Sequence, residues 1–209
     1  MAKYAILVDD RYCIGCNTCF YKCVQENRLH EEASRGLHRT MAFLEKGEEP
    51  GKYHHRCMHC EDPVCAAVCT TGAMSRSDYG AVLHEPDICI VCQSCVLACP
   101  YKVPQYDEAG EGIVKCSMCA HRVVQGQIPA CVEACPTDAL EFGEAKAIRA
   151  KAEKIAAEEG LFLYGIGTNL MVLTTKEPTS LGYPKAPVVS GKGRTFLGGV
   201  LASLIDPKE

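Results

Sequence analysis

The residues with the clearest chemical potential are the sixteen cysteines, which fall into four groups of four along the 209-residue chain. Every group begins with two cysteines separated by two residues and ends with two cysteines separated by three residues. No cysteine of the sequence lies outside these groups. Thiolate sulfur binds iron and zinc, so repeated short spacings of this kind indicate loops that direct several sulfurs at one metal centre.

Groups one and three follow the pattern C-x2-C-x2-C-x3-C, which is typical of bacterial proteins that hold [4Fe–4S] clusters. Group two widens the middle gap to four residues, and group four widens it to eleven. In this pattern the first three cysteines wrap one cluster, and the fourth, at the start of a helix, ligates the other cluster of a two-cluster module. The groups are Cys13, Cys16, Cys19 and Cys23; Cys57, Cys60, Cys65 and Cys69; Cys89, Cys92, Cys95 and Cys99; and Cys116, Cys119, Cys131 and Cys135.

Three other uses of cysteine fit the pattern less well. Disulfides suit short secreted chains, and cysteines two residues apart rarely bridge each other. Zinc sites take four ligands in two close pairs, and redox-active C-x2-C chemistry does not need sixteen cysteines. A zinc-stabilised binding module is the alternative of a different class, and acid-labile sulfide distinguishes it from an iron–sulfur protein.

Histidines and basic side chains lie near several cysteines in the sequence. We interpret the nearby histidines as surface groups or supporting groups rather than ligands: His54, His55, His59 and His121. We expect the nearby cations to be mostly solvated surface charges: Arg11, Lys22, Arg56, Lys102, Lys115 and Arg122. Lys115 and Arg122 flank group four, which makes them the best candidates for tuning a cluster potential.

Short apolar segments divide the groups between two modules. Residues 73–74 and 81–83 flank a turn at 78–80, which predicts a hairpin between groups two and three. Residues 5–8 predict a strand that leads into group one, and residues 139–142 predict a matching strand after group four. We therefore predict an α+β fold with two nested ferredoxin-like modules, in which groups two and three are inserted between groups one and four.

This nesting assigns residues 1–30 with 112–145 to an outer module and residues 53–110 to an inserted module. Sequential pairing, of group one with two and three with four, is the open alternative, although the 33 residues between Cys23 and Cys57 are long for a ferredoxin loop. Nesting predicts four ligand sets: Cys13, Cys16, Cys19 and Cys135 for cluster 1; Cys23, Cys116, Cys119 and Cys131 for cluster 2; Cys57, Cys60, Cys65 and Cys99 for cluster 3; and Cys69, Cys89, Cys92 and Cys95 for cluster 4.

The cysteine segments resemble the four-cluster iron–sulfur subunits of the dimethyl sulfoxide reductase family, which accompany molybdopterin or tungstopterin oxidoreductases. The resemblance covers about residues 4–143 and is carried by YCIGCNTCFYKC, RCMHCEDPVCAAVC with the following TGAM, DICIVCQSCVLACPY, and KCSMCAHRVVQGQIPACVEACPTDAL. It implies the nested pairing of the groups. Some relatives replace one cysteine of group three and hold a three-iron cluster, whereas Cys92 is present here, so the resemblance implies four [4Fe–4S] clusters.

The resemblance also implies an electron-transfer subunit rather than an enzyme. Such a subunit relays electrons between a molybdopterin-containing catalytic subunit and a quinone-linked membrane anchor, as in anaerobic respiration. The sequence contains no G-x-S-x-G motif and no Walker A loop that would indicate substrate chemistry of its own. The alternative function is a soluble polyferredoxin subunit of a formate- or hydrogen-linked complex.

The overall composition narrows the setting in which the chain works. Its formal net charge of −4 argues against a nucleic-acid binder with a dominant basic face. The first residues suggest neither a signal peptide nor a twin-arginine leader, and the apolar stretches at 161–167 and 196–205 are too short to span a bilayer. We expect membrane association only through partner subunits, on the cytoplasmic side or after export with a signal-bearing partner.

The segments without cysteine have their own patterns. The mixed-charge insert at 24–56 predicts a solvated loop with a hairpin. Residues 144–159, rich in Ala, Glu and Lys, predict a helix with a narrow apolar stripe that Gly160 caps, and residues 161–164 and 170–174 predict strands.

Beyond Thr175, glycine and proline recur at short intervals and predict an extended segment that builds no core of its own. We expect residues 146–209 to form a C-terminal extension for subunit docking. Within it, residues 196–205 are either a short amphipathic helix or a capping element.

Overall fold

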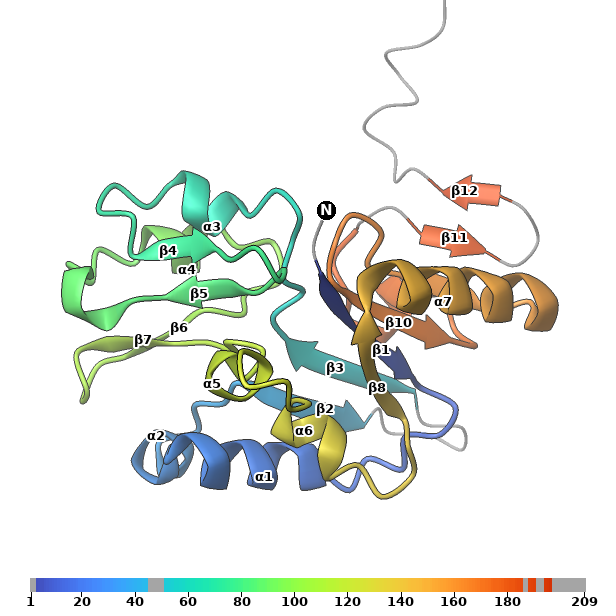
Figure 1. Ribbon diagram of the computed structural model, residues 1–209, viewed down its shortest axis with the longest axis horizontal. Coiled ribbons are helices and arrows are strands. Elements are labelled where there is room, and N and C mark those ends of the chain that lie inside the picture. The colour runs from blue at the N-terminus through green and yellow to red at the C-terminus, as the bar shows by residue number, and fades with distance from the viewer. Residues whose placement is uncertain (1–2, 45–50, 186–187, 191–193, 197–209) are drawn as a thin grey trace, which may run out of the picture.

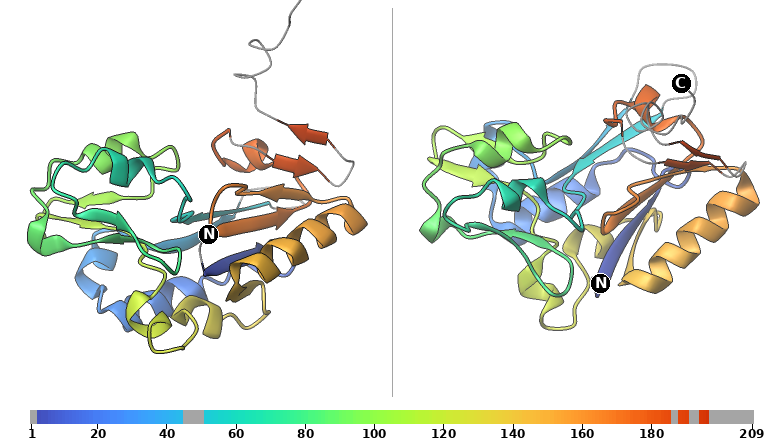
Figure 2. Two further views of the ribbon diagram at one scale, coloured as in Figure 1. Left: turned by 45° about the horizontal axis from the view of Figure 1, so that its top comes forward. Right: turned by 90° about the horizontal axis from the view of Figure 1, so that it is seen from above.

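The computed structural model describes residues 3–44, 51–185, 188–190 and 194–196. A mixed sheet with a long helix on its outer face occupies one side of the molecule, and short helices, hairpins and the cysteine loops occupy the other (Figure 1). The same two regions are separate in the rotated views (Figure 2). This mixed architecture agrees with the predicted α+β class.

Six strands form the sheet, in the order β12-β11-β9-β10-β1-β8. β1 runs parallel to β10 on one side and antiparallel to β8 on the other. The four strands predicted around 5–8, 139–142, 161–164 and 170–174 are confirmed. Their bounds, with those of the two outer strands, are Tyr4–Asp9 (β1), Leu140–Glu144 (β8), Phe162–Tyr164 (β9), Leu170–Thr174 (β10), Val188–Ser190 (β11) and Arg194–Phe196 (β12).

The two faces of β1 serve different layers because successive side chains of a strand point to opposite faces. Ala5 and Leu7 pack against helix α7, which spans Ala145–Glu159 and confirms the predicted helix. Ile6 and Val8 pack toward the cysteine loops on the other face. The sheet therefore lies between helix α7 and the cysteine loops.

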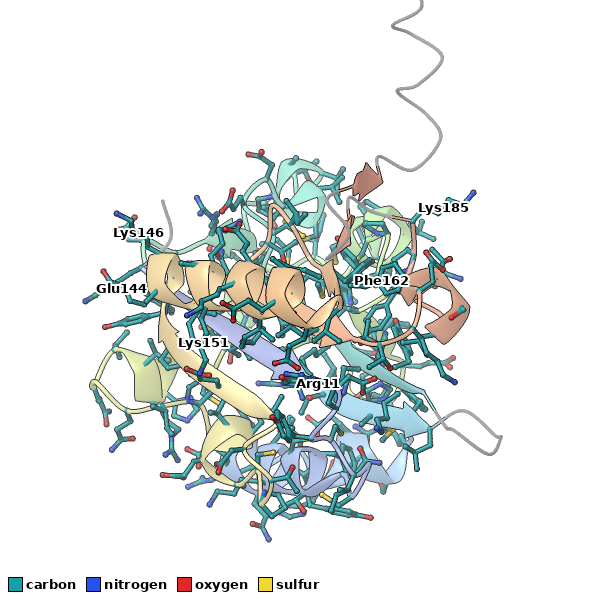
Figure 3. The ribbon with its side chains drawn as sticks, turned by 90° about the vertical axis from the view of Figure 1, so that its right-hand side faces the viewer. Arg11, Glu144, Lys146, Lys151, Phe162 and Lys185 are labelled. Carbon is teal, nitrogen blue, oxygen red and sulfur yellow. The ribbon has the colours of Figure 1, made fainter. Side chains whose placement is uncertain are left out.

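Helix α7 presents alanines to the sheet where the sequence predicted only a narrow isoleucine stripe. Ala145, Ala152 and Ala156 are buried together with Ile148, and their small side chains let the helix lie close to the strands. Gly160 ends the helix with a φ of 69°, a left-handed conformation that glycine adopts without strain. Figure 3 shows the helix across the sheet, with the exposed Lys146 and Lys151 on its outer side.

The segment after Thr175 packs against the main core as far as residue 185. The 3₁₀ helix η2 spans Pro178–Leu181, and both Leu181 and Tyr183 are buried in the main core. The Tyr183 hydroxyl accepts a hydrogen bond from the backbone N–H of His54 at 2.9 Å. A few large apolar side chains thus suffice to seat this segment, whereas residues 197–205 lie outside the described part of the chain.

The other region consists of three hairpins and short helices around the cysteines. The hairpins predicted within 24–56 and between groups two and three are confirmed as β2–β3 and β4–β5, and β6–β7 leads to group four. The strands are Thr40–Leu44 (β2), Lys52–Arg56 (β3), Met74–Arg76 (β4), Val82–His84 (β5), Gln105–Asp107 (β6) and Gly112–Val114 (β7). The helices are Thr18–Asn27 (α1), His30–Ser34 (α2), Val64–Ala67 (α3), Pro86–Ile88 (η1), Ser94–Ala98 (α4), Ala120–Val123 (α5) and Ala130–Glu133 (α6). Among the described residues, no helix combines the length and the apolar character needed to cross a bilayer.

Candidate metal centres

Helix packing decides which cysteine groups meet. Helix α1, which carries Cys19 and Cys23, packs against α6, which carries Cys131. Helix α3, which carries Cys65, packs against α4, which carries Cys95. Group one therefore meets group four, and group two meets group three.

Within each group, the helix carries the third cysteine near its beginning. The fourth cysteine lies one helical turn later, so Cys69, Cys99 and Cys135 come just after the last residue of their short helices. Our prediction that the fourth cysteine stands at the start of a helix is therefore wrong. The x3 spacing equals about one turn, which places the third and fourth sulfurs on one side of the helix.

Two cavities of similar empty volume, about 350 and 330 Å³, are each lined by four cysteines. The first contains the cysteines predicted for cluster 1, and the second contains those predicted for cluster 4. The cysteines are Cys13, Cys16, Cys19 and Cys135 in the first cavity, and Cys69, Cys89, Cys92 and Cys95 in the second.

Of the remaining eight cysteines, five are buried and three are partly exposed. The thiols of Cys116, Cys131 and Cys119 lie close enough to Cys23 to add to the rise in its pKa that burial causes. Burial raises the pKa of Cys60 to about 11, with contributions from Cys65 and Cys99. Cys60 in turn contributes to the raised pKa of Cys57. The structure thus brings together the members of each predicted set.

The first loop of every group has the same unusual backbone. The residue two positions after the first cysteine has a positive φ in all four groups: Gly15, His59, Val91 and Met118. This turn points backbone N–H groups at sulfur: the N–H of Gly15 donates to Cys13 Sγ at 3.4 Å, and that of Met118 donates to Cys116 Sγ at 3.3 Å. Such donors stabilise an anionic sulfur, which explains why three of these loops hold a non-glycine residue in a strained conformation.

Among the described residues, hydroxyl groups lie beside sulfurs of the two cysteine-lined cavities, where they can donate once the sulfur is deprotonated. Thr18 Oγ1 lies 3.3 Å from Cys16 Sγ, and Ser94 Oγ lies 3.4 Å from Cys92 Sγ. These hydroxyls lower the pKa of both thiols. Thr71 and Thr137 stand in the same relation to Cys69 and Cys135, at 3.7 and 3.8 Å. We did not predict these residues from the sequence, although a Ser or Thr two positions after a cysteine recurs four times.

Burial has the opposite effect on other thiols. It raises the pKa of Cys57 and of Cys131 to about 12, and that of Cys95 to about 11. Several neighbouring thiolates in a buried space need a multivalent cation to hold them, and binding then releases the protons. The donor set therefore fits an iron–sulfur group.

The spacing of the sulfurs also bears on the zinc alternative. In tetrahedral zinc sites with Zn–S bonds of about 2.3 Å, the sulfurs are roughly 3.8 Å apart. In the part of the chain that the structure describes, no group of three or more Cys, His, Asp or Glu side chains has the arrangement that holds a single metal ion. Four sulfurs around an open cavity suit a larger group with several metal atoms.

Two of the basic residues near the cysteines are buried, which corrects our expectation of solvated charges. Arg56 is 3% exposed and Lys115 is 4% exposed. The Lys115 ammonium donates to the backbone carbonyls of Val82 and Cys116. By contrast, Arg122 forms ion pairs with Glu26 and Glu133 on the outside of the molecule.

The histidines fall into different environments. His59 is fully buried, and its Nδ1 accepts a hydrogen bond from the backbone N–H of Val82 at 3.0 Å. Burial holds its pKa well below the ordinary value, with a further contribution from the positive charges of Lys115 and Arg56. His121 is exposed and pairs with Glu26. Both agree with the interpretation of the histidines as surface or supporting groups.

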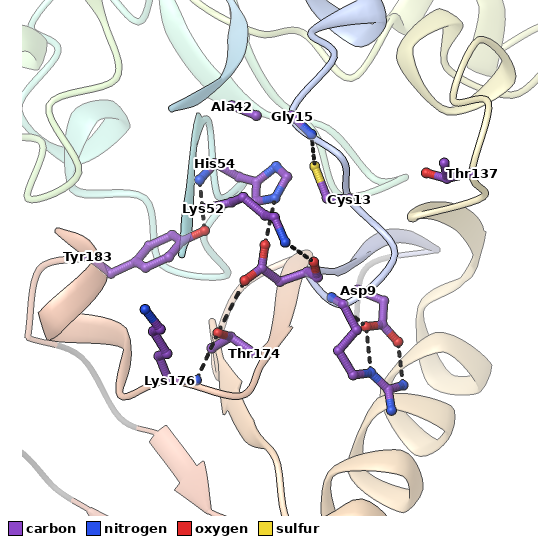
Figure 4. A network of polar contacts seen from close by, with 12 residues as sticks. Asp9, Cys13, Gly15, Ala42, Lys52, His54, Thr137, Thr174, Lys176 and Tyr183 are labelled. Atoms are coloured by element: carbon purple, nitrogen blue, oxygen red, sulfur yellow. Dashed lines mark hydrogen bonds and ion pairs between the residues drawn. The ribbon is translucent and has the colours of Figure 1, made fainter. Parts of the chain in front are cut away.

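A buried polar network adjoins Cys13 (Figure 4). His54 Nε2 faces the Asp10 carboxylate at 3.6 Å, and Lys52 donates to the Asp10 backbone carbonyl at 3.1 Å. The hydroxyl of Thr174 donates to the same carboxylate at 3.4 Å, which joins the network to the sheet. Burial lowers the pKa of His54 and thereby favours the neutral imidazole.

Comparisons with known proteins agree with this chemistry. Residues 53–145 match the 4Fe-4S dicluster domain family. The sequence is 38% identical to the B subunit of anaerobic dimethyl sulfoxide reductase from Escherichia coli (strain K12), over 74% of this protein and 80% of that subunit. It is 32% identical to the corresponding subunit from Haemophilus influenzae over 100% of both proteins, and 34% identical to the iron–sulfur subunit of nitrate-inducible formate dehydrogenase of E. coli, over 75% of this protein and 60% of that subunit. The chain therefore belongs to the 4Fe–4S dicluster iron–sulfur subunits of the dimethyl sulfoxide reductase type, which are electron-transfer subunits of oxidoreductase complexes and not catalytic subunits.

Proposed function

We propose that this chain carries four [4Fe–4S] clusters and relays electrons between a molybdopterin- or tungstopterin-containing catalytic subunit and a quinone-linked membrane anchor. The observation that carries the proposal is the linear succession of the four cysteine sets. Cys19 of set 1 lies near Cys131 of set 2, as its effect on the pKa of that thiol shows. Cys116 of set 2 acts on Cys57 of set 3, and Cys65 of set 3 acts on Cys95 of set 4.

The two ends of this line reach the surface. Cys16 in set 1 and Cys92 in set 4 are exposed, whereas most cysteines of the two inner sets are buried. An exposed isoleucine adjoins each end, Ile14 at 64% and Ile90 at 65% exposure. Exposed apolar side chains beside a redox centre suit contact with partner subunits, so electrons would enter at one end and leave at the other.

The proposed ligands are the four nested sets defined above. Each [4Fe–4S] cluster supplies a one-electron couple when bound. The chain itself contributes sixteen thiolates, the backbone and hydroxyl donors that stabilise them, and a buried path between the exposed ends. The outer module would comprise residues 1–30 with 112–145 and the inserted module residues 53–110, as the packing of α1 on α6 and of α3 on α4 supports.

The partners follow from the relatives. The relatives named for dimethyl sulfoxide reductase support a molybdopterin-containing partner and association with a membrane through further subunits. A second candidate is a polyferredoxin-like subunit of a formate-linked complex without a quinone anchor, and the likeness to a formate dehydrogenase iron–sulfur subunit supports the formate link alone. Quinone-dependent reduction of the clusters in the purified complex distinguishes the two.

The deciding experiment is an analysis of iron, acid-labile sulfide and zinc in the anaerobically purified chain. We expect roughly 16 iron and 16 sulfide per chain. About four zinc ions without sulfide would overturn the proposal and leave a zinc-stabilised module. Purification of the tagged chain from detergent-solubilised membranes then tests the partners, because molybdenum or tungsten, pterin and quinone-dependent reduction of the clusters should all accompany it.

A further inference from the structure

We propose that each module supplies a buried cation to the clusters of the other module. Arg56 raises the reduction potentials of clusters 1 and 2, and Lys115 raises the reduction potential of cluster 3. The inference rests on the proposed function, since it concerns the clusters that the cysteine sets would hold. It assigns to each module a cation that the neighbouring module's sequence supplies.

The two cations occupy the same position in the sequence pattern. Arg56 directly precedes Cys57, the first cysteine of group two, and Lys115 directly precedes Cys116, the first cysteine of group four. By sequence, then, Arg56 belongs to the inserted module and Lys115 belongs to the outer module. Both are buried, so water does not screen their charges from neighbouring groups.

In space, each cation faces the other module. Arg56 lines the cavity formed by Cys13, Cys16, Cys19 and Cys135. Burial alone would lower the pKa of Arg56, but its proximity to the sulfurs of Cys131, Cys19 and Cys116 raises it. All of these sulfurs belong to sets 1 and 2.

Lys115 acts in the reverse direction. Val82, whose carbonyl accepts a hydrogen bond from Lys115, shares a core cluster with Cys65, and its N–H donates to His59, which lies between Cys57 and Cys60. All three cysteines belong to set 3, and the positive charge of Lys115 counteracts the rise that burial causes in their pKa. The Lys115 ammonium is held in place by the carbonyls of Val82 on β5 and of Cys116. The charge of an outer-module residue is thus fixed inside the inserted module.

The hydrogen bonding of Arg56 points to a missing anionic partner. Among the described residues, neither Nε nor Nη2 of Arg56 has a hydrogen-bond acceptor. A buried guanidinium without acceptors is costly, so these donors are expected to serve a group in the cavity that Arg56 lines. An anionic cluster with its thiolates is such a group, and its reduced form, with one more negative charge, gains most from the cation.

The two cysteine-lined cavities provide an internal comparison. Ile14 and Asn17 in the first correspond to Ile90 and Gln93 in the second, at the same spacing from their cysteines. The first cavity adds Arg56 and His54, whereas the second adds His84 and Ile113. Burial lowers the pKa of both histidines, which favours their neutral forms. Arg56 is therefore the charge that distinguishes the first cavity.

Other charges near set 1 offset each other. Asp10 raises the pKa of Cys13 and Lys52 lowers it. Lys52 also donates to the backbone carbonyl of Asp10, so the two residues stay together. Their opposite charges leave Arg56 as the net positive contribution.

The test is an anaerobic redox titration followed by EPR on the chain with its clusters, in complex with its partners. Cys16→Ser and Cys92→Ser identify the signals of clusters 1 and 4. With Arg56→Gln, we expect the ratio of oxidised to reduced protein at a fixed potential to rise about tenfold for clusters 1 and 2, a shift of about 59 mV for one electron. With Lys115→Gln, we expect the same tenfold rise in this ratio for cluster 3, while the ratio for cluster 1 stays within about twofold of the wild-type value.

Each variant serves as the control for the other, and Arg76→Gln, which removes an exposed cation, should leave all four titrations unchanged. Equal shifts of all clusters, no shift, or shifts in the module to which each cation belongs by sequence would overturn the proposal. If a glutamine variant loses iron, the charge-conserving variants Arg56→Lys and Lys115→Arg replace it in the test. Wild-type reduction potentials in these variants support the role of charge, and tenfold shifts in the ratio of oxidised to reduced protein overturn it. A chain without iron and sulfide would instead refute the proposed function itself.

Discussion

The side-chain amide of Asn169 donates to the backbone carbonyl of His59 at 2.9 Å and to that of Gly80 at 3.0 Å. The backbone N–H of Asn169 bonds to the carbonyls of Met58 and His59, each at 3.1 Å. Asn169 directly precedes β10, is fully buried, and therefore joins the sheet to the group-two loop and to the turn of the β4–β5 hairpin. The side chain of Asn169 thus helps to hold the group-two loop and the β4–β5 turn against the sheet, together with the ion pair between Arg149 and Glu61.

We expect Asn169→Leu to destabilise the protein by about 1–3 kcal/mol, because it leaves the buried carbonyl of Gly80 without its side-chain donor and that of His59 with the backbone N–H of residue 169 alone. Anaerobic urea unfolding, followed by circular dichroism on the protein with its clusters, measures the change. Gln127→Ala, at an exposed amide, serves as the control and should stay within about 0.5 kcal/mol of the wild type. A similarly small effect at Asn169 would show that the link is not structural.

The elements around the cysteines were predictable because their signals are local. The hairpin between groups two and three follows from apolar segments around a turn, and the helix at 144–159 follows from its composition. The meeting of group one with group four was predictable from matching strands at either end of the pattern. β1 and β8 do pair, with Ile6 opposite Phe142.

The roles of Arg56, Asn169 and Tyr183 were not predictable, because each depends on contacts between segments distant in sequence. Nothing local distinguishes a buried Arg56 from the exposed Arg76. Tyr183 lies in a segment rich in glycine and proline, yet its ring is buried and its hydroxyl bonds to the backbone of β3. Burial of such residues is a property of the assembled core and not of the pattern around them.

Thr18 and Ser94 offer a matched pair of hydroxyls at opposite ends of the proposed relay. Thr18 and Ser94 lie beside the sulfurs of Cys16 and Cys92. We expect Thr18→Val to lower the potential of cluster 1 and Ser94→Ala to lower that of cluster 4, because each change removes a hydroxyl that can donate to the sulfur once it is a thiolate ligand. The ratio of oxidised to reduced cluster at a fixed potential should rise a few-fold, on the order of tenfold at most.

The measurement is an EPR-monitored redox titration of both variants. Each variant is the control for the other, since the far cluster should titrate as in the wild type. A shift of both clusters in either variant would show that the effect is a general loosening of the protein and not a local hydrogen bond.

The nested ligand sets predict which cysteine substitutions share a phenotype. Cys135→Ser and Cys13→Ser should alter the same EPR signal, because both residues line the first cavity. Cys69→Ser and Cys89→Ser should alter a second signal, because both line the other cavity. Low-temperature EPR spectra of the four reduced variants, with iron content measured in parallel, provide the comparison. If the effects of Cys135→Ser and Cys13→Ser map to different signals, the nested assignment is wrong.

A pair of histidines at the edge of the β2–β3 hairpin predicts a pH dependence of stability. His38 Nε2 lies 2.7 Å from His55 Nδ1, and His55 Nε2 donates to the carbonyl of Lys102 at 3.2 Å. His38 Nδ1 also lies 3.4 Å from the carbonyl of Gly36, a contact that favours the protonated ring and opposes the effect of burial on the pKa of His38. Burial lowers the pKa of both histidines, and His38 lowers that of His55 further.

Below the ordinary histidine pKa of about 6.5, the unfolded chain binds protons that the folded pair resists, so the free energy of unfolding should fall as the pH drops from 7.5 to 5.5. We expect His38→Gln, whose amide still donates to His55, to reduce this slope by up to about 1.4 kcal/mol per pH unit, the value for one proton. Anaerobic urea unfolding at several pH values measures the slope. His30→Gln, at an exposed histidine, should keep the wild-type slope, and an unchanged slope in His38→Gln would exclude the pair as its source.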